Sequence, residues 1–155
     1  MYGIISRGEN RLKGFFDFVN SNADHMTVQE SKNHNVLTFA FVGDAIWSLF
    51  VRTYLAVKST AKAGTLHTQT TQFVKASFQS FLIDFLLPNL TEQESSVVKT
   101  ARNAHTNNIA KHSSLQEYKK STSFEALLGF LYLTHQNQRL KQILDLCTQK
   151  MEIER

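Results

Sequence analysis

Hydrophobic side chains recur along most of the chain at intervals of three and four residues, the spacing that places them on one side of an α-helix. Two segments, residues 36–57 and 122–134, are apolar almost all round. A helix of that kind is expected at the centre of a fold rather than at its surface. Residues 65–87, 91–103 and 138–153 have separate apolar and polar faces and are predicted to pack around the first two. The pattern therefore predicts an all-α helical bundle.

Local signals define several helix boundaries. Pro88 is expected to end the helix over 65–87, because proline cannot continue a helical hydrogen-bond ladder. Thr91 and Glu94 have the spacing of a capping box and are expected to open the next helix. The polar residues 104–113 are predicted to form a loop, and Ser114-x-x-Glu117 is expected to open only a short turn.

One acidic residue interrupts each of the two most apolar segments: Asp44 in the first and Glu125 in the second. A lone carboxylate in such a place needs a partner, a metal or a polar cavity. Gly43 directly precedes Asp44, and Gly129 lies one turn after Glu125; glycine lets two helices approach closely. If the helices cross there, the two carboxylates repel unless a cation neutralises them. Few, hard oxygen ligands suit Mg²⁺.

Ordinary structural roles remain open for both acids at this point. Glu125 follows Thr122 by three residues, so this pair also has the spacing of a capping box. Asp44 could instead pair with a buried donor such as Arg52 or a tyrosine. Neither alternative requires a metal ion.

The positive charge of the chain is concentrated in one stretch. Residues 99–120 contain five Lys and Arg against one acidic residue, and this excess of four equals the net charge of +4 of the whole chain. A concentrated basic stretch indicates a polyanionic partner more than a diffuse surplus does. The alternative is a solvated loop with ordinary lysines.

Length and composition narrow the class of protein. The chain has 155 residues, 42% of them hydrophobic, with twelve Phe, one Pro and six Gly, which suits one globular helical domain. The single cysteine, Cys147, excludes an internal disulfide and is expected to be buried. No stretch approaches the ~20 apolar residues of a membrane-spanning helix. We expect a cytoplasmic protein with no membrane partner; an organelle stroma or matrix is the alternative.

The residues around both acids resemble the two signatures of the ribonuclease III family. The first reads Phe41-Val42-Gly43-Asp44-Ala45-Ile46-Trp47 and the second reads Phe124-Glu125-Ala126-Leu127-Leu128-Gly129. Two further acids of that family would fall at Ala40 and Thr122, where this chain has none. The Mini-III branch of the family is similar in this respect, and Arg102-Asn103-Ala104 and the region of Tyr118 and Lys119 resemble it too.

The resemblance implies a ribonuclease III-like catalytic domain over residues 31–155, preceded by an extension or loose segment over 1–30 and without a double-stranded-RNA-binding domain. It implies a homodimer that cuts double-stranded RNA and leaves a 3′ overhang. Asp44 and Glu125 would bind Mg²⁺, for which Mn²⁺ can substitute, and Thr122 would assist from the second coordination shell. RNA-binding residues would be Arg102, Asn103, Lys111 and Lys119.

The implied task is maturation of the large-subunit (23S-type) precursor ribosomal RNA, with a ribosomal protein as a candidate partner. One alternative is a catalytically inactive, ribonuclease III-like RNA-binding protein of a ribosomal particle, and another is a helical interaction protein without an RNA role. Phe39, Trp47 and Phe50 are expected mainly in the monomer core, with a dimer interface as their alternative role.

Overall fold

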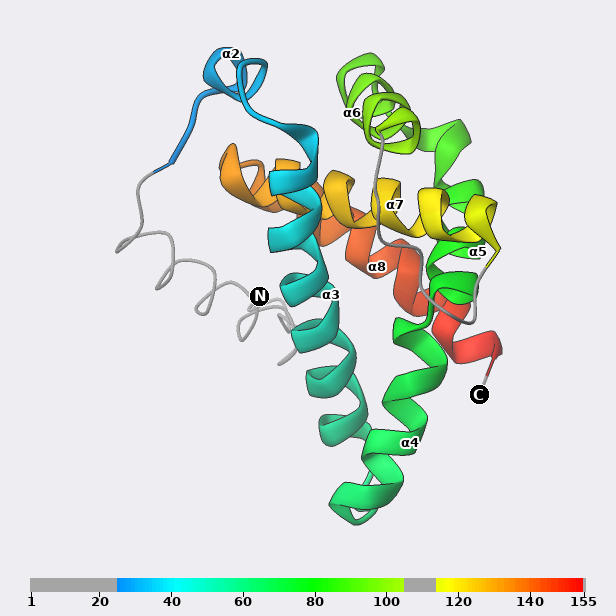
Figure 1. Ribbon diagram of the computed structural model, residues 1–155. Helices are drawn as coiled ribbons and strands as arrows, with labels where there is room; N and C mark the ends of the chain where they lie inside the picture. Colours follow the sequence, from blue (N-terminus) through cyan, green and yellow to red (C-terminus); the bar gives the residue numbers. More distant parts are fainter. Residues whose placement is uncertain (1–24, 105–113, 155) are drawn as a thin grey trace, which may run out of the picture.

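The computed structural model describes residues 25–104 and 114–154, and within these ranges the regular structure is helical, with no strand. Two long helices, α3 (Val36–Lys58) and α7 (Leu115–Leu133), cross at the centre of the molecule (Figure 1). The remaining elements surround them: α2 (Val28–Ser31), α4 (Ala63–Val74), α5 (Ala76–Leu86), the 3-10 turn η1 (Leu87–Asn89), α6 (Glu92–Asn103) and α8 (Asn137–Ile153). The predicted all-α bundle is confirmed.

The core forms around α7, which packs against α3, α5, α6 and α8. Trp47 of α3 is completely buried and meets the Phe124 ring of α7 edge to face, with ring centroids 5.1 Å apart. Phe39 is buried as well, and its ring lies 5.9 Å from that of Phe130. These aromatic residues therefore stabilise the monomer, as expected, rather than a dimer interface.

The helix α7 begins earlier than predicted. The Ser114 hydroxyl accepts a hydrogen bond from the Glu117 amide at 3.1 Å, and the Glu117 carboxylate accepts one from the Ser114 amide, so this capping box opens α7 itself rather than a short turn. Thr122 consequently lies inside the helix, where its hydroxyl donates to the Tyr118 carbonyl at 3.0 Å. The capping role considered for Glu125 is thus wrong, which leaves its carboxylate unexplained by helix capping.

The segment predicted as one helix over 65–87 is two helices, α4 and α5, separated by an extended residue, Lys75 (φ −66°, ψ 150°). Two side chains take the carbonyl groups freed at the end of α4. The Trp47 indole nitrogen donates to Phe73 O at 3.0 Å, and the Gln79 amide nitrogen donates to Val74 O at 3.0 Å. Tertiary hydrogen bonds, rather than a glycine or proline, accompany this break.

The helix α3 is long and apolar enough, by length and composition alone, to cross a membrane, which corrects the expectation that no segment approaches that size. Its packing is that of a central bundle helix, because it lies against α7 along its buried side and against α4 near its end. Asp44 lies within its third turn and is exposed. The length of α3 serves the fold by spanning the bundle and by linking α7 to α4.

Candidate functional site

The two central helices touch backbone to backbone at two glycines. A Cβ atom on Gly43 would overlap the carbonyl oxygen of Glu125, and one on Gly129 would overlap the carbonyl oxygen of Phe39. The same added atom on Gly129 would also lie 3.0 Å from the Gly43 nitrogen. Any side chain at either glycine would therefore push the helices apart. The predicted glycine crossing is present, and it brings Asp44 beside Glu125.

The two acids differ in their surroundings. Asp44 is exposed, whereas Glu125 is partly buried on α7, which packs against α3 and α5. Burial and, to a smaller extent, the negative charge of nearby Asp44 together raise the pKa of the Glu125 carboxyl group to about 8, against an opposing interaction with the Gln79 side chain. The site thus holds one carboxyl group that ionises readily only when positive charge arrives.

Among the described residues, no cationic side chain forms an ion pair with either carboxylate. Across residues 25–104 and 114–154, the four ion pairs are formed by other residues. Arg52, the partner considered for Asp44, directs its guanidinium group to the Ser48 carbonyl at 3.2 Å instead. The internal salt link that would have explained Asp44 is therefore not formed.

The donor set fits a hydrated divalent cation. Two carboxylates converge, one of them buried and facing like charge, and a cation would relieve both the repulsion and the burial cost. The described part of the chain offers no group of three or more His, Cys, Asp or Glu side chains that could enclose a metal. Mg²⁺ suits a site of one or two carboxylates because it keeps several waters and binds substrate phosphates directly.

The positions of the two missing family acids, Ala40 and Thr122, supply no further carboxylate. Ala40 is buried in the core near the crossing. Thr122 is buried as well, and its hydroxyl hydrogen is occupied by the Tyr118 carbonyl. A role for Thr122 in the second coordination shell remains a prediction.

Sequence reasoning missed Gln79, which reaches the Glu125 carboxyl group from α5. A signal was present in the chain, since Gln79 occupies a place in an apolar stripe with Leu82, Ile83 and Leu86, at helical spacing. A polar residue in such a stripe is the same anomaly that singled out Asp44 and Glu125.

The predicted RNA-binding residues lie on two elements. Arg102 and Asn103 form the end of α6, and Lys119 is a partly exposed residue near the beginning of α7. Lys119 precedes Glu125 by six residues, which is about 9 Å along the helix axis at 1.5 Å per residue. Lys111 lies outside the described residues. Lys119 thus shares a helix with Glu125, and α6, which carries Arg102 and Asn103, packs against that helix.

Two features refine the distribution of charge. Lys120 is 2.6 Å from Asp84 of α5, so its charge is already balanced within the protein. Residues 45–83, by contrast, contain no acidic residue and four basic ones: Arg52, Lys58, Lys62 and Lys75. This segment includes most of α3 and all of α4, whose adjoining ends project together from the bundle (Figure 1). Lys58 is paired with Glu152 at 2.6 Å, so Arg52, Lys62 and Lys75 are the basic residues of this segment that take part in no ion pair among the described residues.

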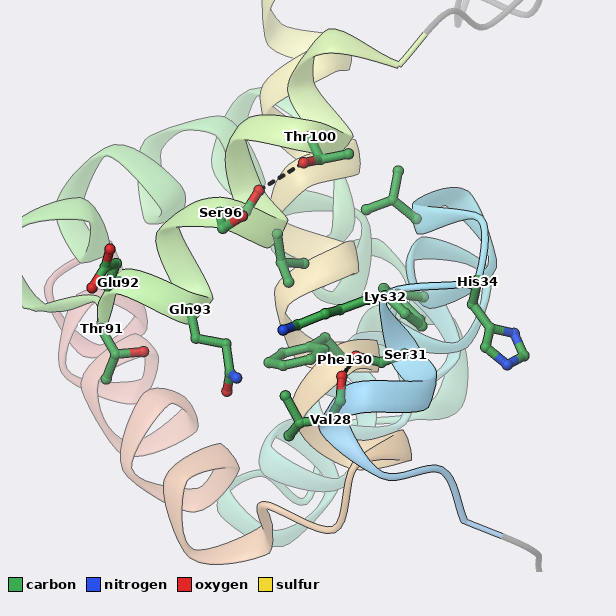
Figure 2. A pocket seen from close by; sticks show the side chains of 13 residues that line it. Val28, Ser31, Lys32, His34, Thr91, Glu92, Gln93, Ser96, Thr100 and Phe130 are labelled. Atoms are coloured by element: carbon green, nitrogen blue, oxygen red, sulfur yellow. Dashed lines mark hydrogen bonds between the residues drawn. The ribbon is translucent and has the colours of Figure 1, made fainter.

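A separate pocket of about 580 Å³ lies between α2 and α6, with Phe39 and Phe130 in its lining. Figure 2 shows the Lys32 side chain running into this pocket beside the Phe130 ring, with Gln93 and Ser96 on the α6 side. Neither Asp44 nor Glu125 belongs to its lining. The pocket is thus distinct from the acid pair.

Comparison with known proteins gives a consistent result. The model of the ribonuclease III domain matches residues 37–136. Mini-ribonuclease 3 of Clostridium tetani is 40% identical over 79% of this chain and 82% of its own length. Mini-ribonuclease 3 of a Thermoanaerobacter species is 35% identical over 93% of this chain and 99% of its own. A crystal structure of a Fusobacterium nucleatum protein superposes with a TM-score of 0.70 at 28% identity, covering 78% of this chain and 97% of that one.

Proposed function

The chain belongs to the ribonuclease III family and is an endoribonuclease of double-stranded RNA, and from that premise we propose that Asp44 and Glu125 form its catalytic centre by binding a divalent cation, Mg²⁺ or Mn²⁺. Ribonuclease III enzymes are generally dependent on divalent metals. The observation that supports the assignment to these residues is the backbone contact at Gly43 and Gly129, which places two carboxylates together without a cationic partner.

In this proposal, Asp44 and Glu125 have different roles at the metal site. Glu125 is held inside the bundle and supplies a fixed carboxylate, while the exposed Asp44 faces the solvent from which substrate arrives. A divalent cation, when bound, supplies stabilisation of the charge that develops on the phosphate and lowers the pKa of water. Both carboxylates must be ionised to bind it, so binding displaces the proton that Glu125 otherwise retains.

Affinity for RNA is proposed to come from the catalytic domain itself, through Arg102, Asn103, Lys111 and Lys119. Lys119 has no ion-pair partner within the described ranges, unlike its neighbour Lys120. Duplex RNA is recognised mainly by its shape and through phosphates and 2′-hydroxyl groups across the minor groove. Contacts of this kind weaken steeply with salt, because they release counterions.

The proposed homodimer uses the exposed side of α3. Phe41 is 80% exposed although it directly precedes the crossing, and Leu49 is 46% exposed on the same helix. Exposed large apolar residues on one helix face indicate a protein contact. Members of the ribonuclease III family generally act as dimers, and a second copy packed on this face would bring two acid pairs to one duplex. Each pair would cut one strand and leave a 3′ overhang.

We further propose precursor large-subunit ribosomal RNA as the substrate, a ribosomal protein as a partner, and the cytoplasm as the site of action. The similarity to Mini-ribonuclease 3 proteins over most of the chain makes this RNA the first substrate to test. The test is cleavage of a 23S-type precursor beside an unrelated duplex of equal length. Equal rates on the two RNAs would contradict the substrate assignment while leaving the nuclease intact.

The central test compares the wild-type protein with Asp44→Asn on duplex RNA in Mg²⁺. We expect cleavage by the wild type only, with similar RNA affinity in both proteins, because Asn keeps the size of the side chain. Equal inertness of both would favour the alternative of an inactive RNA-binding protein. Equal cleavage by both would remove Asp44 from the catalytic centre.

A further inference from the structure

Gln79 is the polar member of an otherwise apolar stripe on α5. It is 2% exposed, and the neighbours on its face, Leu82, Ile83 and Leu86, are equally buried. A buried amide is costly unless it hydrogen-bonds, so a purely structural position in this stripe would favour an apolar side chain. The hydrogen bonds of Gln79 therefore indicate what it does.

The Gln79 amide lies between the end of α4 and Glu125. Its amide nitrogen donates to the Val74 carbonyl at 3.0 Å, and its side chain lies close enough to the Glu125 carboxyl group to oppose the rise of that group's pKa. An amide nitrogen has two hydrogens, of which the Val74 carbonyl takes one. Rotating the amide by 180° would place Oε1 against the Val74 carbonyl oxygen, so the hydrogen bond to Val74 determines the orientation of the group.

The other end of the amide is not satisfied. Oε1 of Gln79 is buried and has no hydrogen-bond partner among the described residues. Buried polar atoms without partners are rare in folded proteins, because each of them loses its hydration without replacement. The Oε1 atom of Gln79 thus stays without a partner, while its nitrogen lies between the end of α4 and Glu125.

We propose that Gln79 is a positioning residue of the metal site, which holds the Glu125 carboxyl group in place at the helix crossing before a divalent cation binds. The inference rests on the proposed function, because it takes Asp44 and Glu125 as the ligands. A glutamate has several freely rotating bonds, and a ligand fixed in advance loses less conformational freedom on binding. Groups that orient metal ligands from the second shell typically change metal affinity or activity about 10- to 100-fold.

The variant Gln79→Met tests this, since methionine has a similar volume and no donor. Mn²⁺ binding to the protein alone, measured by titration calorimetry, should weaken about 10- to 100-fold. Duplex RNA binding without metal should be unchanged because Gln79 is buried. Cleavage should fall at low Mn²⁺ and recover toward the wild-type rate at saturating Mn²⁺. A loss of packing alone would not be restored by the metal.

Thr70→Val is the matched control, because Thr70 is also buried and its hydroxyl donates to the Leu66 carbonyl of α4 at 2.8 Å. It should lower stability without changing Mn²⁺ affinity. If Gln79→Met does not fold, Gln79→Asn keeps an amide that is too short to reach Val74 and Glu125 together, and the same weakening is expected. Wild-type affinity in a folded Gln79 variant overturns the inference. Failure of the wild type itself to bind Mn²⁺ refutes the proposed metal site instead.

Discussion

Two carboxylates among the described residues are shielded from solvent, Glu94 fully and Glu125 in part, and their surroundings are opposite. Glu94 of α6 is 1% exposed and is bound by Arg139 of α8 through two hydrogen bonds of 2.7 and 2.9 Å. Burial opposes its ionisation, but the hydrogen bonds from Arg139 and from the Thr91 backbone, with the charge of Arg139, outweigh that effect and lower its pKa. Glu125 has Asp44 as its charged neighbour, and its pKa rises to about 8.

The difference separates a structural carboxylate from a functional one. The charge and the hydrogen-bonding groups of Glu94 are satisfied inside the protein. Glu94 completes a capping box with Thr91, and its partner Arg139 also donates to the Asn89 carbonyl at 2.7 Å. The Glu94 pair thereby joins α6, η1 and α8. Glu125 has the Gln79 amide and the negatively charged Asp44 as neighbours. Its negative charge must therefore be balanced by a bound cation.

The largest expected effect is a loss of RNA cleavage when Glu125, the carboxylate without a cationic partner among the described residues, is replaced by a neutral residue. Glu125→Gln should lower kcat/KM by about 100- to 1,000-fold, the scale of losing one electrostatic contact in an active site. The fold should remain intact, because no protein cation depends on Glu125. Single-turnover cleavage of a duplex RNA, with circular dichroism as the folding control, measures both. An unfolded Glu125→Gln protein would make this residue a structural one, like Glu94.

The reciprocal variant, Glu94→Gln, should damage the fold and spare the chemistry. Removing one partner of a buried ion pair costs about 3 kcal/mol, because the remaining charge loses its counter-ion. For a chain of this size that corresponds to a decrease in Tm of roughly 6–12 °C. Thermal unfolding provides the measurement, and cleavage below the transition should stay near the wild-type rate. A selective loss of cleavage without loss of stability would contradict the division drawn here.

Much of this contrast could be predicted from the sequence, because its causes are local. Thr91 and Glu94 have capping-box spacing, and the lone acids beside Gly43 and Gly129 stand out from their apolar helices. The family resemblance depended on the same residues. The break at Lys75 could not be predicted, since it coincides with hydrogen bonds from Trp47 and Gln79, which are tertiary.

The early start of α7 was missed for a related reason. Residues 115–121 contain mostly polar side chains, and their helical state depends on the cap at Ser114 and on continuation into the apolar part of α7. The pairing of Lys120 with Asp84, 36 residues away, was equally invisible to a count of charges. Long-range partners decide which residues of a motif are available for function, and one sequence without a structure does not reveal them.

A smaller effect concerns pH and distinguishes the two carboxylates in the metal-free protein. The folded-state pKa of Glu125, about 8, is above its usual value of 4.5, so the folded protein retains a proton that the unfolded chain releases between these values. This contribution to stability is complete below pH 4.5 and is lost as pH rises through 8. The Tm of Glu125→Gln relative to wild type should therefore increase from pH 5 to pH 8.5 in EDTA.

The affinity for Mn²⁺ should depend on pH through the same Glu125 proton. Below pH 8, Mn²⁺ must displace it, so the apparent affinity should rise about tenfold per pH unit and level off above pH 8. Asp44→Asn removes the like charge and provides the control: its residual Mn²⁺ affinity should level off at a lower pH. An affinity independent of pH between 6 and 8 would show that Glu125 is already ionised in the free protein.

The smallest expected effect is on RNA affinity, and it compares two lysines in place of two carboxylates. Lys119 and Lys120 are adjacent in α7, yet Lys120 is 2.6 Å from Asp84, while Lys119 takes part in none of the ion pairs seen over residues 25–104 and 114–154. Lys119→Gln should weaken binding to every duplex sequence alike and reduce the slope of log affinity against log salt by about one. Lys120→Gln should leave that slope unchanged and lower stability by no more than about 1 kcal/mol, the value of a partly exposed ion pair. Fluorescence anisotropy over a salt series measures both slopes, and equal slopes for the two variants would mean that the pairing with Asp84 does not decide which lysine binds RNA.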